Sequence, residues 1–149
     1  MIKLIRTSSQ HTDFQNLVSL LDADLKIRDG DDSLFYSQFN KIDKIKEVIV
    51  VFQDHEPIGC GAFKKYDERS AEIKRMFIKP EFRGQRIAAK VLSALEQWAG
   101  ELGYTYCILE TGYKQPEAIA LYKRSGYQVI PNYGQYQGVE NSICMKKAI

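Results

Sequence analysis

The chain has 149 residues, of which 44% are hydrophobic and 27% are charged, so it is long enough for one compact domain with a sizeable core. A formal net charge of +2, without any Lys/Arg run longer than two, argues against nucleic-acid binding. The apolar segments are too short to cross a bilayer and residues 1–10 lack a signal-peptide profile, so we expect no membrane association and a single cytoplasmic domain over residues 1–149.

The first predicted elements are a strand over residues 1–6 and an amphipathic helix over residues 13–27. One face of that helix carries apolar side chains at helical spacing, namely Phe14, Leu17, Val18, Leu21 and Leu25. The polar segment after the helix contains the turn signal Asp29-Gly30 and predicts a short helix from Ser33.

In the central part of the chain, the sequence has the two-residue period that is typical of strands. The remainder contains helices and strands in turn. Strands are expected over residues 47–53, 57–66, 70–78, 105–110, 127–130 and 141–147, and a helix over residues 116–125. With the helix that follows residue 78, the order is βα(α)βββαβαββ. This order predicts a mixed α/β fold, in which helices cover both faces of a largely antiparallel sheet of about seven strands.

The helix after residue 78 has an unusual start, which we place at Gly84. A helix N-terminus carries partial positive charge and normally has acidic side chains in its first turn. Here the start carries Arg83, Arg86 and Lys90 instead. Either these residues form a solvated basic face, or the start binds an anion such as a pyrophosphate. Neither GxxxxGK[ST] nor a GxGxxG after a strand is present, which disfavours a P-loop and a dinucleotide fold.

Two segments resemble motifs of the GNAT N-acetyltransferase superfamily. The segment "RMFIKPEFRGQRIAAKVL" is similar to motif A, [QR]-x-x-G-x-[GA], and "QPEAIALYKRSGY" is similar to N-x-x-A-x-x-L-Y-x-x-x-G-[FY]. Both motifs occur in the family's order, and the expected strand order also agrees with the family fold. The chain departs from the pattern at Arg86, which replaces a glycine, and at Gln115, which replaces an asparagine.

The resemblance implies acetyl-CoA as acetyl donor, with no metal. Its pyrophosphate is expected at the backbone of residues 83–88, and its pantetheine arm between the strands 71–78 and 105–110. The expected cofactor-binding residues are Met76, Phe77, Ile78, Arg83, Gly84, Gln85, Arg86, Ile87, Ala88, Gln115 and Tyr122.

The resemblance also implies two catalytic candidates. Tyr122 aligns with the tyrosine that protonates the departing thiolate, and Glu72 occupies the strand position of a general base. The alternatives are that Tyr122 only packs, and that Glu72 forms an ion pair with Lys74 or Arg69 while a water chain carries the proton.

The expected acceptor is a small-molecule primary amine, and a protein lysine or N-terminus is the second choice. Its candidate contacts are the carboxylates and rings of Asp31, Asp32, Tyr36, Tyr133 and Tyr136. A solvated acidic loop with a tyrosine-rich homodimer contact, and a CoA-binding module without turnover, remain open. Three cysteines stand in apolar sequence and are expected as reduced core residues: Cys60, Cys107 and Cys144.

Overall fold

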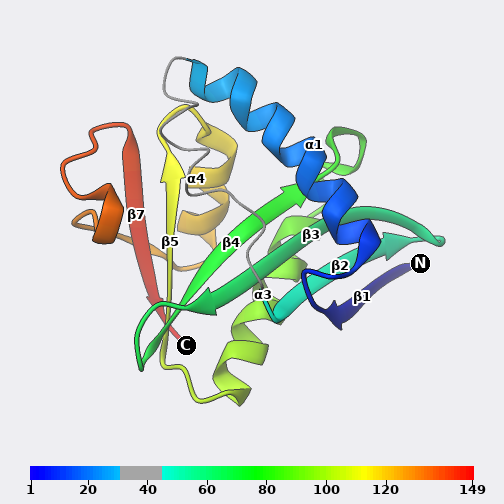
Figure 1. Cartoon of the computed structure of the whole chain (residues 1–149), viewed down its shortest axis with the longest axis horizontal. Helices are drawn as coiled ribbons and strands as arrows, with labels where there is room; N and C mark the ends of the chain where they lie inside the picture. The colour runs from blue at the N-terminus through cyan, green and yellow to red at the C-terminus, as the bar shows by residue number, and fades with distance from the viewer. Residues whose placement is uncertain (31–44) are drawn as a thin grey trace.

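The structure, a computed structural model, describes residues 1–30 and 45–149 of the chain (Figure 1). Seven strands form one sheet in the order β1-β2-β3-β4-β5-β7-β6. The elements are β1 (Ile2–Thr7), α1 (Thr12–Asp29), β2 (Glu47–Gln53), β3 (Glu56–Lys65), β4 (Ser70–Ile78), α3 (Ile87–Glu101), β5 (Tyr106–Gly112), α4 (Pro116–Arg124), β6 (Gln128–Ile130) and β7 (Ser142–Ala148), with short 3₁₀ helices η2 (Pro80–Phe82) and η3 (Gly134–Tyr136).

The predicted fold class is confirmed. Every neighbouring strand pair is antiparallel except β4 and β5, which run parallel. Helix α1 begins after His11, whose imidazole accepts the backbone N–H of Asp13. The short helix expected from Ser33 lies outside the described residues. Among the described residues, no helix is long and apolar enough to span a membrane.

Helices cover both faces of the sheet because successive side chains of its strands point to opposite faces, and both sets are apolar. On β2, Val48 and Val50 pack with α1, whereas Ile49 and Val51 belong to the core beneath α3. Helix α4 lies on the same face as α3, since its Tyr122 belongs to that second core. Figure 1 shows α1 in front of the sheet and α3 and α4 behind it.

The sheet is split between β4 and β5. These strands pair only at Ser70–Tyr106, Ala71–Cys107 and Glu72–Ile108, and then diverge toward the top of Figure 1. Beyond Glu72 the edge of β4 that faces β5 is therefore open.

A bulge in β4 accompanies this split. Between the pairs Cys60–Phe77 and Ala62–Lys74, Gly61 stands opposite two residues, and one of them, Arg75, has a φ of 60°. A bulge bends its strand and changes the direction of its side chains. The buried guanidinium of Arg75 donates to Asp22 of α1 at 2.9 Å, which holds the bulge against that helix.

The predicted start of the helix after β4 is wrong by three residues. Helix α3 begins at Ile87, and Arg86 is its N-cap residue, in the left-handed conformation with a φ of 63°. Gly84, at a φ of 83°, lies in the preceding loop. The loop forms because η2 ends at Phe82 and two left-handed residues follow before the helix begins.

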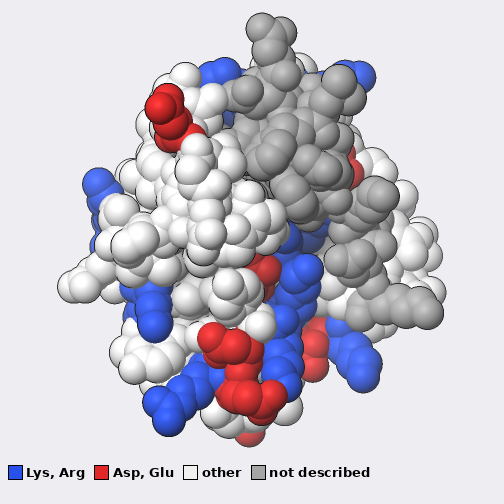
Figure 2. Space-filling model, turned by 60° about the vertical axis from the view of Figure 1, so that its left-hand side comes forward, with Lys and Arg blue, Asp and Glu red and all other residues white. Residues whose placement is uncertain are grey.

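The cysteine prediction is confirmed for all three residues. Cys60, Cys107 and Cys144 are free and buried. Burial raises the pKa of the Cys60 thiol to about 12, so all three behave as core side chains. On the face drawn in Figure 2, basic and acidic side chains lie close to one another over the described residues.

Candidate functional site

A cleft occupies the split between β4 and β5. Five elements supply its walls: Leu21 and Leu25 of α1, residues 72–76 of β4, residues 110–112 of β5, Ala118 and Tyr122 of α4 with its N-cap residue Gln115, and Tyr136 of η3. Segments far apart in the sequence therefore meet where the two strands separate.

Tyr122 lines this cleft from α4. Its side chain is buried, and burial together with the charge of Glu110 raises the pKa of its phenol well above the usual value. Within the described part of the chain, no hydrogen bond engages its hydroxyl. The phenol therefore stays protonated at neutral pH and can donate its proton into the cleft.

Glu72 lines the cleft from β4, at the point where the pairing of β4 with β5 ends. Its side chain is only 4% exposed, and its Oε2 accepts a hydrogen bond from the hydroxyl of Tyr133 at 2.7 Å. Burial, followed by the charge of Glu72, raises the pKa of the Tyr133 phenol, so this phenol remains a donor. The sequence contained no signal for the Tyr133–Glu72 contact, because the two residues are 61 positions apart.

The expected acceptor contacts divide into two groups. Tyr136 lines the cleft, and the Tyr133 ring packs edge to face against it from behind the lining, with the centroids 5.9 Å apart. Asp31, Asp32 and Tyr36 lie outside the described residues. Two carboxylates are nevertheless present at the cleft, Glu72 of β4 and Glu110 of β5, together with the cationic Lys74 and Arg75.

Sequence reasoning missed Glu110 and Lys74, both of which line the cleft. Burial is the main reason that the pKa of Lys74 is lowered. The one available signal was a charged residue inside an otherwise apolar strand, "YCILETG" for Glu110. The cleft therefore combines two carboxylates, an amine and two phenols in a largely buried setting.

The expected cofactor strand residues take three different directions. Met76 lines the cleft, Phe77 packs into the α1 core and Ile78 into the α3 core. The carbonyl oxygen of Ile78 accepts a hydrogen bond from Nε of Arg83 at 2.8 Å, and the Arg83 guanidinium lies 5.6 Å from the centroid of the Phe77 ring.

The loop before α3 combines basic side chains with an uncapped helix start. No side chain caps α3, and its first turn contains no acidic residue. Arg86 is exposed and Gln85 is exposed, whereas Ile87 is buried and Ala88 half-buried. Uncapped backbone N–H groups beside arginines can receive an anion.

Gln115 is the N-cap residue of α4 and lines the cleft, and its side chain makes no cap hydrogen bond. Its amide, which can both donate and accept hydrogen bonds, therefore stands at the cleft wall without a capping role. Among the described residues, no group of three or more His, Cys, Asp or Glu side chains is placed to hold a metal ion.

Comparisons with known proteins agree with this arrangement. An IAA acetyltransferase of Azospirillum brasilense is 36% identical over 93 residues, which cover 62% of this chain and 61% of that protein. An uncharacterized N-acetyltransferase, YsnE of Bacillus subtilis, is 32% identical over 100 residues, 66% of each chain. These matches thus span about three fifths to two thirds of the relatives' lengths.

Solved structures share the whole fold. A putative acyl-CoA N-acyltransferase from Klebsiella pneumoniae superposes with a TM-score of 0.83 at 29% identity, covering 99% of this chain and 97% of that one. A PaiA N-acetyltransferase from Thermoplasma acidophilum, in complex with coenzyme A, has a TM-score of 0.77 at 17% identity, covering 100% and 99%. At that identity the second likeness shows the fold alone.

The family comparison covers most of the chain. The acetyltransferase (GNAT) family profile matches residues 14–127, a range that contains the split of the sheet, the loop before α3, and Tyr122. On this match, with the fold it shares, the chain belongs to the GNAT acetyltransferase family.

Proposed function

We propose that the protein is an N-acetyltransferase that moves the acetyl group of acetyl-CoA to the primary amine of a small molecule, by direct attack in a ternary complex. The observation that carries the proposal is the position of Tyr122 and Glu72 in one cleft, at the point where β4 and β5 separate. Relatives whose names include acetyltransferase, and a structural neighbour solved with coenzyme A, support the donor.

The donor's phosphates fit the loop before α3. Backbone N–H groups of residues 83–88 and the charges of Arg83 and Arg86 would hold the pyrophosphate. Arg86 does not block this site, because the donors are backbone groups and its side chain is exposed. The open edge of β4 at Met76 and Ile78, together with Gln115, would hold the pantetheine arm.

Bound there, acetyl-CoA supplies an activated thioester to the cleft. The attacking amine must be neutral, although a free alkylamine has a pKa of about 10.4. We assign Glu72 to accept its proton, because this carboxylate is buried in the cleft and fixed by Tyr133. The backbone N–H of Met76 is assigned to the carbonyl oxygen of the thioester.

Tyr122 is assigned to the leaving group. When the thioester C–S bond breaks, the sulfur departs as a thiolate and takes the phenolic proton of Tyr122. Burial suits the tyrosine to this task, because a raised pKa keeps the proton in place until the thiolate forms. The Tyr122 side chain needs no change of charge before the reaction begins.

The acceptor side of the cleft suits a primary amine. Glu72 and Glu110 can accept hydrogen bonds from it, while Lys74 and Arg75 of the same lining balance their charge, and the rings of Tyr133 and Tyr136 supply aromatic surface nearby. Both carboxylates lie between helices and strands rather than on an open face, which favours a small amine over a folded protein surface.

The experiment is a calorimetric titration with acetyl-CoA, followed by thiol release over a panel of small amines, lysine peptides and peptides with free N-termini. We expect binding, and thiol release that is fastest with a small amine. Binding without thiol release for any amine would instead identify a CoA-binding module. Release with peptides only would identify a protein acetyltransferase.

A further inference from the structure

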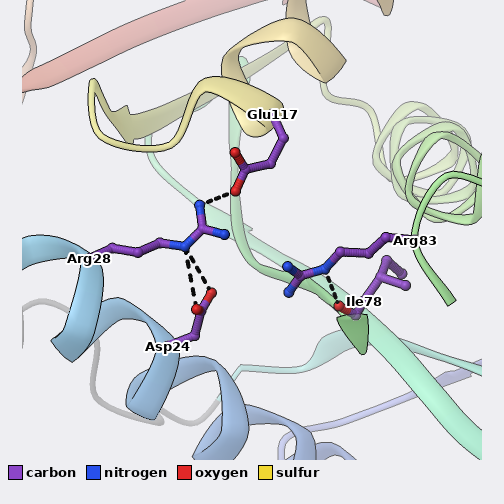
Figure 3. Close-up of polar contacts among 5 residues, drawn as sticks. All are labelled: Asp24, Arg28, Ile78, Arg83 and Glu117. Carbon is purple, nitrogen blue, oxygen red and sulfur yellow. Dashed lines mark hydrogen bonds and ion pairs between the residues drawn. The ribbon is translucent and has the colours of Figure 1, made fainter. Parts of the chain in front are cut away.

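An ion pair joins two helices that lie on opposite faces of the sheet. Nη1 of Arg28, near the end of α1, donates to Oε1 of Glu117, in the first turn of α4 (Figure 3). The backbone of an intact sheet separates side chains on its two faces, and the divergence of β4 from β5 beyond Glu72 leaves room for this pair. The Arg28–Glu117 pair therefore crosses the split.

The same pair lies beside the cleft described above. Leu25, one helical turn before Arg28, lines the cleft from α1. On α4, Gln115 and Ala118 line it on either side of Glu117 in the sequence. The donor arm proposed above, between the loop before α3 and Tyr122, would run along this side of the cleft.

Asp24 holds Arg28 in place independently of Glu117. Nε of Arg28 lies 3.2 Å from Oδ2 of Asp24, one turn earlier on α1. The Arg28 side chain is 24% exposed, whereas that of Glu117 is 53% exposed. The arginine is thus the fixed member of the pair, and the glutamate can turn away into solvent.

Arg83 approaches the same place from the loop before α3. Figure 3 shows the guanidinium groups of Arg28 and Arg83 reaching from opposite sides toward the space beside Glu117. Burial opposes ionisation of Glu117, but its hydrogen bonds and the charges of Arg28 and Arg83 outweigh this and lower its pKa. The free protein therefore already holds one anionic group between these two arginines.

We propose that Glu117 occupies the place of a phosphate, and that Arg28 exchanges Glu117 for a phosphate oxygen of acetyl-CoA when the donor binds. The Arg28–Glu117 pair closes the split in the free protein and opens in the complex. This inference rests on the proposed function, because it takes the donor to bind in the split. A guanidinium binds a phosphate with the same bidentate geometry as a carboxylate, and an ion pair to a half-exposed carboxylate contributes little to stability, so the exchange costs little.

The test is the dissociation constant of acetyl-CoA, measured by calorimetry for Glu117→Gln, Arg28→Gln and the double variant. Glu117→Gln removes the competing anion and leaves Arg28, so affinity should rise about threefold to fivefold. Arg28→Gln removes the phosphate contact, so affinity should fall about tenfold or more. The double variant should equal Arg28→Gln, because Glu117 acts through Arg28.

A control is the Arg6–Glu101 pair, which joins β1 to α3 at 2.8 Å with its glutamate about as exposed as Glu117 and its arginine more exposed than Arg28. Glu101→Gln and Arg6→Gln should leave acetyl-CoA affinity within about twofold of the unaltered protein, and thermal unfolding of every variant establishes that it is folded. Equal tightening by both Glu117→Gln and Arg28→Gln, or no change in either, would overturn the exchange. If the unaltered protein does not bind acetyl-CoA, the proposed function fails, and the exchange fails with it.

Discussion

The hydroxyl of Tyr133 donates a hydrogen bond to Oε2 of Glu72 at 2.7 Å. This contact ties the segment between β6 and β7 to the last residue of β4 that pairs with β5, which is also the residue assigned as general base. Tyr66 packs on the other side of the Tyr133 ring, with centroids 5.0 Å apart. One tyrosine thus fixes the position of a carboxylate at the edge of the cleft.

Tyr133→Phe should reduce stability through that carboxylate. The ring remains, but Glu72, 4% exposed, loses a hydrogen-bond donor. We expect the free energy of unfolding, measured in urea, to fall by about 1 to 3 kcal/mol. Tyr66→Phe is the control, since Tyr66 keeps its ring contact and should change stability by less than about 0.5 kcal/mol. Equal effects of the two variants would mean that the bond to Glu72 adds nothing.

Arg86→Gly should stabilise the start of α3. Arg86 has a φ of 63°, a conformation that costs a residue with a Cβ about 1 to 2 kcal/mol and costs glycine little. Arg86→Ala is the matched control, because it removes the same charge but keeps the Cβ. Urea unfolding should therefore rank Arg86→Gly above Arg86→Ala. If Arg86→Ala were the more stable variant, replacing Arg86 by glycine would relieve no backbone strain.

The Arg86→Gly variant also tests where the donor binds. Because the expected phosphate donors are backbone N–H groups, Arg86→Gly should change the dissociation constant of acetyl-CoA by less than about tenfold. Loss of measurable binding would identify the Arg86 side chain as the main anchor.

Two glycines in open space should respond to alanine in opposite directions. A Cβ added at Gly84 or at Gly100 meets no atom within 4 Å, but Gly84 has a φ of 83°. Gly84→Ala should therefore cost about 1 kcal/mol through backbone strain alone. Gly100→Ala, inside α3, should stabilise the protein by roughly 0.5 to 1 kcal/mol. Two changes of the same sign in urea unfolding would contradict this account of the loop before α3.

The sequence predicted the order of elements well because that order depends on local patterns. The alternation of Val48, Ile49, Val50 and Val51 places β2 between two cores whatever the rest of the chain does. The start of α3 was misplaced because an arginine in the left-handed conformation has no sequence signal.

The cleft was predictable only in part. The family motifs indicated Tyr122 and the strand of Glu72, and both residues line the cleft. Glu110 had only the weak signal of a charge in an apolar strand, and the Tyr133 partner of Glu72 was not predictable, since it depends on a contact across 61 residues. The bulge at Arg75 shows the same limit, because its left-handed conformation is held by Asp22 of another element.

The buried thiols should make the protein less stable at alkaline pH. Burial raises the pKa of Cys60 from 9.0 to about 12. Its contribution to stability is therefore present below pH 9 and is lost as the pH rises toward 12, because the unfolded chain releases the proton first. Between pH 9 and 11, the free energy of unfolding should fall less steeply with pH in Cys60→Ala than in the unaltered protein. The difference in slope should be up to about 1.4 kcal/mol per pH unit. Parallel slopes for both proteins would exclude this role for the thiol.

Glu72→Gln and Tyr122→Phe should differ in their dependence on pH. A lost base is partly replaced at high pH, where more of the amine acceptor is already neutral. Turnover of Glu72→Gln should therefore recover toward pH 9, whereas that of Tyr122→Phe should stay low, since no proton donor is regained. Parallel pH–rate profiles would contradict the separate assignments of base and acid.

The central claim is that Tyr122 protonates the departing thiolate, and the turnover number of Tyr122→Phe tests it most directly. Tyr127→Phe is the control, because Tyr127 packs against Tyr122 with ring centroids 5.8 Å apart but donates its hydroxyl to Glu96. By calorimetry, we expect Tyr122→Phe to bind acetyl-CoA normally. In a thiol-release assay with the best amine, its turnover number should fall by roughly a hundredfold or more. Tyr127→Phe should keep its turnover. Near-normal turnover of Tyr122→Phe would contradict the claim and leave Tyr122 a packing residue.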